Sequence, residues 1–298
     1  MPGTRPKVRE PARAAWAFYV KWTANMGGRR PTWHRPILDI RVRYSLRVHN
    51  DSRRQYDTFS EDYHWLYSDY ALCGKPALEE NEDVLTGAGL KAQILDCSCG
   101  IGTLAVALAK FGYEVSGSDA SPGMVEQATQ AAKNADVDIP LSCCPWEDLP
   151  GHFPNRFDLV FCIGNSIGHT RNREEMLRSL AGMRAVLGNG GKLVIQSRNW
   201  EQLRREKKRL THFQWRERGG QRCLPLYIWT FPEKFDDAHT IDVVLVFDSG
   251  GKASIRSYSI VYYPFHVEEL VESLRCAGFT EVRNGFSEST PEYRVIAS

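Results

Sequence analysis

The sequence has no long apolar run and no paired cysteine motif. Its apolar stretches, such as residues 241–247, are far shorter than the roughly 18 residues that a membrane-spanning helix needs. No apolar block of signal-peptide length follows the basic N-terminus. None of the eight cysteines forms the Cys-x-x-Cys pair that zinc sites commonly use. We therefore predict a cytoplasmic protein with reduced thiols, no metal and no membrane-spanning segment.

Acidic residues are scarce at the start of the chain. Residues 1–54 contain 13 Lys and Arg but only three acids, whereas residues 55–298 contain 25 basic and 33 acidic residues, a net charge of about −8. Because phosphate backbones bind basic surfaces, this acidic body disfavours a nucleic-acid partner. We expect residues 1–54 to be a poorly ordered basic extension and residues 55–298 to form the folded domain.

Apolar strands alternate with helical segments in the middle of the chain. Strands are predicted at 92–98, 113–119, 138–144, 157–166 and 191–199, and helices at 53–70, 103–112, 121–135 and 173–188. This alternation is typical of an α/β fold with a mainly parallel sheet. The pattern then changes to short antiparallel strands, which predicts a β insertion at about 201–262. A helix and two strands are expected to follow it.

The segment "ILDCSCGIGT", residues 94–103, joins a predicted strand to a predicted helix. It lacks the lysine of a phosphate-binding G-x-x-x-x-G-K-[ST] loop, and Ala105 stands where a dinucleotide fingerprint has its third glycine. Asp96 would repel a pyrophosphate, but it suits a cofactor that carries a positive amino group. Asp119, at the end of the next strand, matches the two hydroxyls of a ribose. These residues favour S-adenosylmethionine (SAM) over NAD, although the glycine spacing alone leaves NAD open.

Several segments resemble one enzyme family. Residues 94–128 resemble the first cofactor motif of the class I SAM-dependent methyltransferases. The segments "FDLVFCIGNSIGHT", "LVIQSRNW" and "SIVYYPFHVEELVESLRCAGF" resemble the glycine N-methyltransferase and glycine/sarcosine N-methyltransferase group. The resemblance covers about residues 55–298. It implies a Rossmann-like, seven-stranded class I methyltransferase sheet with an antiparallel β insertion after strand five.

The resemblance also implies roles for individual residues. Together with Asp96, the residues expected to hold SAM are Tyr56, Trp65, Ser98, Gly100, Gly102, Asp119, Ala120, Met124, Trp146, Ile163, Gly164, Asn165, Ser166 and His169. Arg198 is expected to bind the carboxylate of the acceptor, with Asn165 at the point of methyl transfer and Tyr263 beside the acceptor. Tyr56 is expected to close over the cofactor and to take part in catalysis. An arginine fork pairs bidentately with a carboxylate, which supports the role of Arg198 independently.

The sequence says less about the acceptor than about the cofactor. The family has a tyrosine after its Arg-Asn pair, whereas Trp200 follows here, and the basic segment 201–222 has no counterpart. We predict an enzyme that methylates the nitrogen of glycine, sarcosine or a related amino acid. Alternatives are a C- or O-methyltransferase of a larger metabolite and a SAM-binding protein without turnover. An NAD-dependent oxidoreductase is disfavoured by Asp96. The expected partner is a small-molecule acceptor, and a homo-oligomer stays open.

Overall fold

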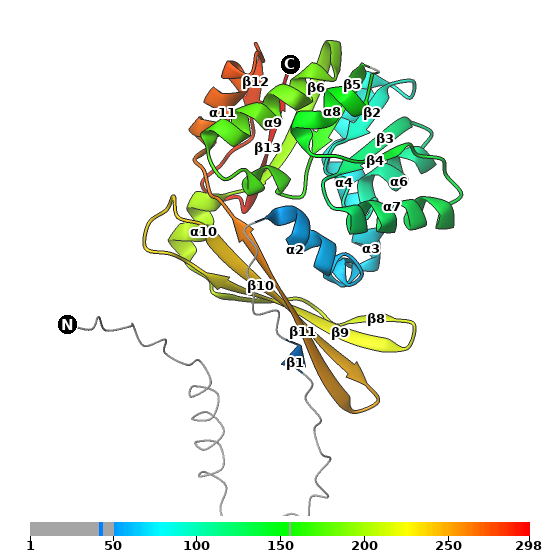
Figure 1. The fold of residues 1–298 in the computed structure, drawn as a ribbon, viewed down its shortest axis with the longest axis vertical. Coiled ribbons are helices and arrows are strands. Elements are labelled where there is room, and N and C mark those ends of the chain that lie inside the picture. The colour runs from blue at the N-terminus through cyan, green and yellow to red at the C-terminus, as the bar shows by residue number, and fades with distance from the viewer. Residues whose placement is uncertain (1–41, 44–50, 155) are drawn as a thin grey trace, which may run out of the picture. The chain divides into compact units, whose positions relative to one another are not determined.

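A computed structural model describes residues 42–43, 51–154 and 156–298 (Figure 1). Most of the predicted basic extension, residues 1–41 and 44–50, lies outside the described residues, so its boundary stays a prediction. The described chain contains two β-sheets with helices around them. Within this part of the chain, no helix is both long and apolar enough to cross a membrane.

The larger sheet has seven strands in the spatial order β12-β13-β6-β5-β2-β3-β4. The five strands from β6 to β4 in that order are parallel, whereas β13 pairs antiparallel with both β6 and β12. The predicted Rossmann-like sheet is thereby confirmed. Its strands are β2 Gln93–Asp96, β3 Glu114–Asp119, β4 Leu141–Cys143, β5 Phe157–Cys162, β6 Leu187–Arg198, β12 Val282–Asn284 and β13 Glu292–Ala297.

Side chains of this sheet alternate between two apolar clusters. Ile94 and Phe161 belong to the cluster on one face, and Leu95 and Val160 belong to the cluster on the other. This alternation follows from the two-residue repeat of a strand. One face is covered by α4 Lys75–Glu80, α5 Glu82–Ala88, α6 Thr103–Lys110 and α7 Pro122–Asn134. The other face is covered by α8 Leu149–His152, α9 Arg173–Ala185 and α11 Val267–Cys276.

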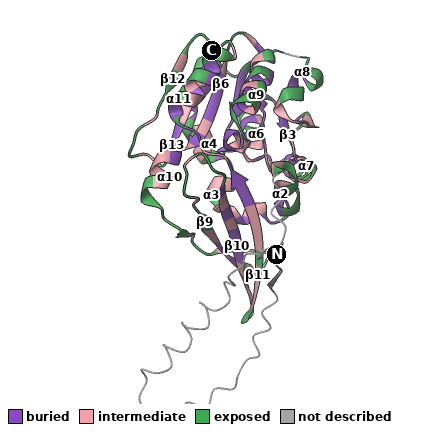
Figure 2. Ribbon diagram, turned by 60° about the vertical axis from the view of Figure 1, so that its left-hand side comes forward, coloured by how far each residue is buried: buried purple, intermediate pink, exposed green. Residues whose placement is uncertain are grey.

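The second sheet has six strands and lies between β6 and α11 in the sequence, apart from one strand near the N-terminus. Its order is β1-β11-β10-β9-β7, and β8 also pairs with β9. Buried and half-buried residues alternate along β10, so one face joins the main core (Figure 2). The strands β7 to β11 of this sheet form the predicted β insertion, whereas β1 lies in the predicted basic extension. The strands of this sheet are β1 Val42–Arg43, β7 Leu210–His212, β8 Arg216–Arg218, β9 Gln221–Thr230, β10 His239–Ser249 and β11 Lys252–Tyr262.

The segment predicted as one helix over residues 53–70 is interrupted. It forms α2 Ser52–Phe59, the 3₁₀ turn η1 Tyr63–Leu66 and α3 Asp69–Leu72. The chain turns before η1 because Asp62 is buried and bonded to the second sheet, where Arg256 Nη1 lies 2.5 Å and Tyr258 Oη 2.5 Å from its carboxylate. As a result, α2 lies between the two sheets (Figure 1).

Candidate active site

A cavity of about 320 Å³ opens at the carboxyl ends of β2, β3 and β5. Ligands of open α/β sheets bind at this edge. We call it the large cavity. Twelve of the predicted cofactor residues line it: Tyr56, Asp96, Ser98, Gly100, Asp119, Ala120, Met124, Trp146, Ile163, Gly164, Ser166 and His169. The structure therefore brings together residues that lie more than 100 positions apart in the sequence.

Asp119 holds the loop between β2 and α6 in place. Its carboxylate accepts hydrogen bonds from the backbone N–H of Gly100 at 3.0 Å and of Ser121 at 2.9 Å. Gly100 and Gly102 both have positive φ, at 51° and 83°, which side chains other than glycine rarely adopt. A Cβ on Gly102 would lie 3.1 Å from Ala128 in α7. Gly102 is not on the cavity wall, and it supports the site by letting the loop pack against α7.

Two carboxyl groups line the large cavity, the buried Asp96 and the half-buried Asp119. Burial raises the pKa of Asp96 to about 7, and the nearby Asp119 charge adds to the shift. Burial also raises the pKa of Asp119, although three backbone N–H groups oppose this shift. A positively charged ligand would favour the ionised form of both groups. The acidic pair thus fits a cationic cofactor, and a pyrophosphate would meet two like charges.

Trp146 is fixed against the wall of the large cavity. Its indole N–H donates a hydrogen bond to the backbone carbonyl of Cys97 at 2.8 Å. On the other side, α9 approaches its backbone at Gly182, where a Cβ would lie only 2.1 Å from the Trp146 carbonyl oxygen. A glycine at that position lets the turn η2 Trp146–Asp148 pack onto α9 and so sets the depth of the indole ring.

A second cavity, of about 20 Å³, shares Tyr56 and Tyr63 with the large cavity. We call it the small cavity. Its other lining residues come mainly from the second sheet and are Leu66, Arg198, Tyr227, Ile241, Val243, Ile260 and Tyr262. The wall is therefore apolar and aromatic, with a single guanidinium group.

Arg198, at the end of β6, is enclosed by aromatic rings. Its Cζ lies 5.0 Å from the ring centre of Trp229 and 5.9 Å from those of Trp200 and Tyr262. Among the described residues no carboxylate forms an ion pair with it. The rings stabilise the cation without using its N–H groups. Arg198 thus keeps its donors for a ligand, which argues against a surface salt-bridge role.

Asn165 lies beside both cavities without lining either. It adopts φ of 65°, and its side-chain oxygen accepts a hydrogen bond from the backbone N–H of Arg198 at 3.0 Å. Its buried Nδ2 has no partner within the described part of the chain. The side chain thus connects the end of β5 to the end of β6, and a direct role in transfer stays a prediction.

Three side chains form the wall between the cavities. The Tyr56 hydroxyl lies 2.9 Å from His169 Nε2 and 3.2 Å from the Tyr262 hydroxyl. The His169 ring stacks on Tyr262 with centres 4.5 Å apart, and it meets Tyr56 edge-on at 5.2 Å. His169 ends the 3₁₀ turn η3 Ser166–His169, so α2, η3 and β11 meet here.

Two other predicted residues lie away from the cavities. Trp65 belongs to η1, and its buried ring packs edge-on against Phe247 at 5.6 Å with Arg218 over it at 5.3 Å. It points into the second sheet because the chain turns after α2. The backbone N–H of Tyr263 donates to the carbonyl of Gly168 at 2.8 Å, and its side chain lines neither cavity.

Sequence reasoning missed most of the small cavity. Four of its lining residues come from three neighbouring strands and face the same side of the second sheet: Tyr227, Ile241, Val243 and Ile260. The only signal for them was the alternation of apolar residues along these strands, which indicates a buried face without saying what it encloses. Tyr63 and Tyr67, on the wall of the large cavity, are not among the residues that the sequence predicted for the site.

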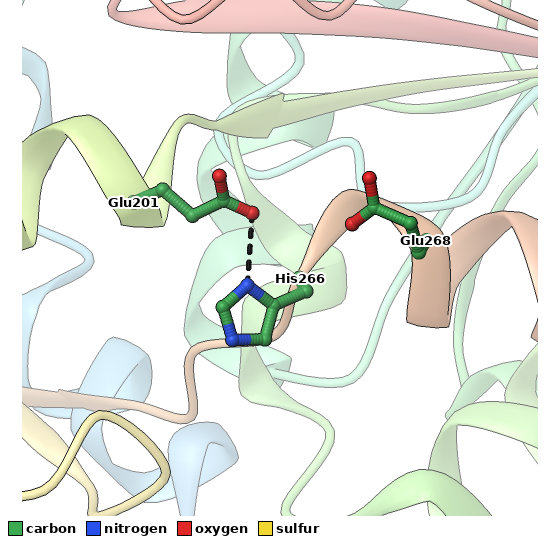
Figure 3. Close-up of side chains that lie close together, drawn as sticks. All are labelled: Glu201, His266 and Glu268. Carbon is green, nitrogen blue, oxygen red and sulfur yellow. Dashed lines mark hydrogen bonds and ion pairs between the residues drawn. The ribbon is translucent and has the colours of Figure 1, made fainter.

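A cluster of possible metal ligands lies where α10 Trp200–Glu206 meets the start of α11. Figure 3 shows Glu201 from α10 with His266 and Glu268 at the start of α11, and their ligand atoms lie within 4.8 Å of one another. His266 Nδ1 is 2.9 Å from a Glu201 oxygen. Both acids occupy first helical turns, where the helix dipole stabilises carboxylates. The cluster is explained as a link between the two helices.

Sequence comparison gives a partial match. The methyltransferase-domain family matches residues 94–191. The glycine/sarcosine N-methyltransferase of Parasynechococcus marenigrum (strain WH8102) is 33% identical over 110 residues, which cover 37% of this chain and 39% of that protein. The ubiquinone biosynthesis O-methyltransferase of Xanthomonas euvesicatoria pv. vesicatoria (strain 85-10) is 30% identical over 108 residues, 36% of this chain and 44% of that protein. The match thus spans about two fifths of these relatives.

Structural comparison extends the likeness over most of the chain. A SAM-bound amino pentose methyltransferase from Micromonospora echinaspora, involved in calicheamicin biosynthesis, superimposes with a TM-score of 0.64 at 16% identity. The superposition covers 80% of this chain and 95% of that one. At this identity the likeness shows the fold alone. Together with the matched segment, it confirms the resemblance drawn from the sequence: the chain contains a methyltransferase domain and has the class I SAM-dependent methyltransferase fold.

Proposed function

We propose that this protein is a SAM-dependent methyltransferase that methylates the amino nitrogen of a compact carboxylate-bearing acceptor, such as glycine or sarcosine. The observation that carries the acceptor assignment is Arg198, a guanidinium that opens into the small cavity without an acidic partner among the described residues. A carboxylate matches its planar fork of N–H donors.

The residues of the large cavity fit SAM. Asp96 would hold its ammonium group and Asp119 its ribose, while Trp146 and Met124 would flank the adenine. When bound, SAM supplies an electrophilic methyl group whose bond to sulfur breaks with both electrons remaining on sulfur. The fixed loop at Gly100 and the fixed indole of Trp146 mean that the protein orients the cofactor with little rearrangement.

The size of the small cavity restricts the acceptor. A volume of about 20 Å³ suits a group of a few atoms, because one water molecule needs roughly 10–15 Å³ by the same kind of measure. A carboxylate fits this space, whereas a sugar ring does not. The apolar lining by Ile241, Val243 and Ile260 excludes water around the pairing and strengthens it.

The buried side chains favour nitrogen over oxygen or carbon as the nucleophile. A hydroxyl or carbon acceptor needs a base, whereas a neutral amine attacks with its own lone pair. His169 is the imidazole on the cavity wall, and burial lowers its pKa to about 4, so it is a weak base. This supports N-methylation over the C- and O-methylation that the sequence left open.

A substrate panel tests the proposal. The protein is incubated with SAM and glycine, sarcosine, methylamine or glycolate, and S-adenosylhomocysteine release is measured with mass spectrometry of the product. We expect turnover with glycine or sarcosine and little with methylamine, which lacks the carboxylate, or with glycolate, which lacks the amine. Equal turnover of methylamine and glycine would refute the carboxylate assignment. Turnover of none, with tight SAM binding, would refute the acceptor class.

A further inference from the structure

The imidazole of His169 is held in one tautomer by its surroundings. Its Nδ1 lies 3.0 Å from the backbone carbonyl oxygen of Val261 in β11. A carbonyl oxygen can only accept a hydrogen bond, so Nδ1 must carry the proton. In the neutral ring, Nε2 is then an acceptor, and the Tyr56 hydroxyl at 2.9 Å must donate to it.

This arrangement decides the direction of the next hydrogen bond. The Tyr56 hydroxyl has one proton, which is committed to His169. The Tyr262 hydroxyl, 3.2 Å from the Tyr56 oxygen, must therefore be the donor in that pair. The Tyr56 oxygen accepts from Tyr262 and retains one further lone pair. Because Tyr56 lines both cavities, this lone pair belongs to the wall where cofactor and acceptor would meet.

We propose that His169 is a positioning residue, which fixes the Tyr56 oxygen as a hydrogen-bond acceptor for an N–H group of the methyl acceptor. The inference rests on the proposed function and deepens it, because it assigns the group that orients the nucleophile. A hydrogen bond from one amine N–H to the Tyr56 oxygen restricts the rotation of the amine and so orients its lone pair. If His169 instead donated to Tyr56, the tyrosine would present its own proton to that lone pair and block it.

The transfer step needs no proton movement in this wall. The lone pair of the neutral amine forms the new C–N bond, and the positive charge arrives on nitrogen. The N–H that faces Tyr56 stays on nitrogen, where its hydrogen bond to the tyrosine oxygen strengthens as the charge develops. The excess proton leaves with the product ammonium group.

Burial keeps the network in this protonation state. It lowers the pKa of His169 to about 4 and raises the pKa of Tyr56 well above its usual 10. The titratable side chains in ring contact with His169 are Tyr56 from α2 and Tyr262 from β11. Proton transfer from Tyr56 to His169 is therefore unfavourable, and Nε2 remains a hydrogen-bond acceptor.

The tautomer can be tested without turnover. In protein labelled with nitrogen-15 at histidine, the imidazole shifts of His169 at pH 7 should show a protonated Nδ1 and an unprotonated Nε2. His169→Phe identifies the resonances by their loss. A protonated Nε2 would overturn the proposal, whatever the enzyme methylates.

Kinetics test the positioning role on the best substrate of the panel. In His169→Phe and Tyr56→Phe we expect kcat to fall by about 100-fold, a typical cost of misplacing a reactant by an ångström. The Michaelis constant for SAM should stay within about threefold. His169→Gln should recover much of kcat, because its amide oxygen can accept from Tyr56. The double Phe variant should be no slower than either single variant.

His152→Phe is the matched control. This imidazole also contacts a backbone carbonyl through Nδ1, at 3.1 Å from Asp148, but it is exposed and outside both cavities. Its activity should match the wild type. Unchanged kcat in His169→Phe, with SAM affinity and melting temperature preserved, would refute the positioning role. A wild type inactive on every amine would refute the proposed function and with it the N–H donor, whereas a protonated Nε2 would refute the role of His169 by itself.

Discussion

The large and small cavities meet at Tyr56 but are built in different ways. The large cavity is formed mainly by loops that follow strands of one parallel sheet, and Asp119 holds two of these loops through their backbone N–H groups. The small cavity is formed by the face of a second sheet together with Arg198 from the first. The large cavity repeats one local arrangement, a loop after a parallel strand, whereas the small cavity depends on segments that are distant in the sequence. The large cavity thus depends on the parallel sheet, and the small cavity depends on how the second sheet packs beside it.

Arg198→Gln should give the largest effect and act on one cavity only. The Michaelis constant for a carboxylate acceptor should rise by about 100-fold, since losing one partner of a desolvated charge pair costs about 2–4 kcal/mol. The SAM dissociation constant should change less than about threefold. Arg222→Gln is the control, because Arg222 also lies over an indole, that of Trp215 at 4.8 Å, but outside both cavities. Equal losses for acceptor and SAM would show that the two cavities are not separable.

Asp119→Asn should act on the other cavity. The amide can keep only one of the two backbone hydrogen bonds and loses the charge. We expect calorimetry to show SAM binding weakened by about 30-fold, in line with the roughly 2 kcal/mol of a charged hydrogen bond. Once SAM is saturating, the acceptor Michaelis constant should be near that of the wild type. A large change in the Michaelis constant for the acceptor would show that Asp119 also affects the small cavity.

Cofactor affinity should depend on pH through Asp96. The ionised Asp96 carboxylate attracts a cation, and the protonated form does not. The pKa of Asp96 without a ligand is about 7. Binding below pH 7 must therefore release a proton, so affinity falls as the pH falls. We expect the SAM dissociation constant to rise about fivefold from pH 7 to pH 6. In Asp96→Asn the dependence should flatten, and an unchanged slope would assign it to another group.

Trp65→Phe should give the smallest effect on function. Because the indole is buried against the second sheet, removing its second ring should lower the free energy of unfolding by about 1–2 kcal/mol in urea titrations. SAM affinity should change less than about twofold, since Trp65 lines neither cavity. A loss of SAM affinity above tenfold with normal stability would restore the cofactor role that the sequence suggested.

Sequence reasoning reached the two regions to different depths. Gly100, Asp96 and Asp119 could be placed at the edge of the large cavity from the sequence, because a strand, a turn and a helix start are local patterns. Arg198 could be placed at the end of a strand for the same reason, and the roles of all four residues stay predictions.

The rest of the acceptor side depends on tertiary structure. Nothing near Tyr227 or Ile241 in the sequence shows that they enclose a guanidinium from another sheet. The sequence of α2 continues smoothly into η1, so it does not show that the bond between the buried Asp62 and the exposed Arg256 turns the chain and carries Trp65 into the second sheet. Local sequence patterns thus predict which edge of the parallel sheet faces a ligand. The packing of the two sheets determines the shape of the small cavity.

Three consecutive residues of α2 bond to three different parts of the fold. Gln55 accepts from the backbone N–H of Val261 at 3.0 Å, Tyr56 donates to His169, and Asp57 accepts from the backbone N–H of Gly123 at 2.7 Å. A ligand that shifts this helix in one cavity must alter its contacts in the other. Thermodynamic linkage then requires the effect to be reciprocal. If bound SAM changes the affinity for the acceptor by some factor, bound acceptor changes the affinity for SAM by the same factor. One short helix would thus couple the affinity for SAM to the affinity for the acceptor, by the same factor whichever of them binds first.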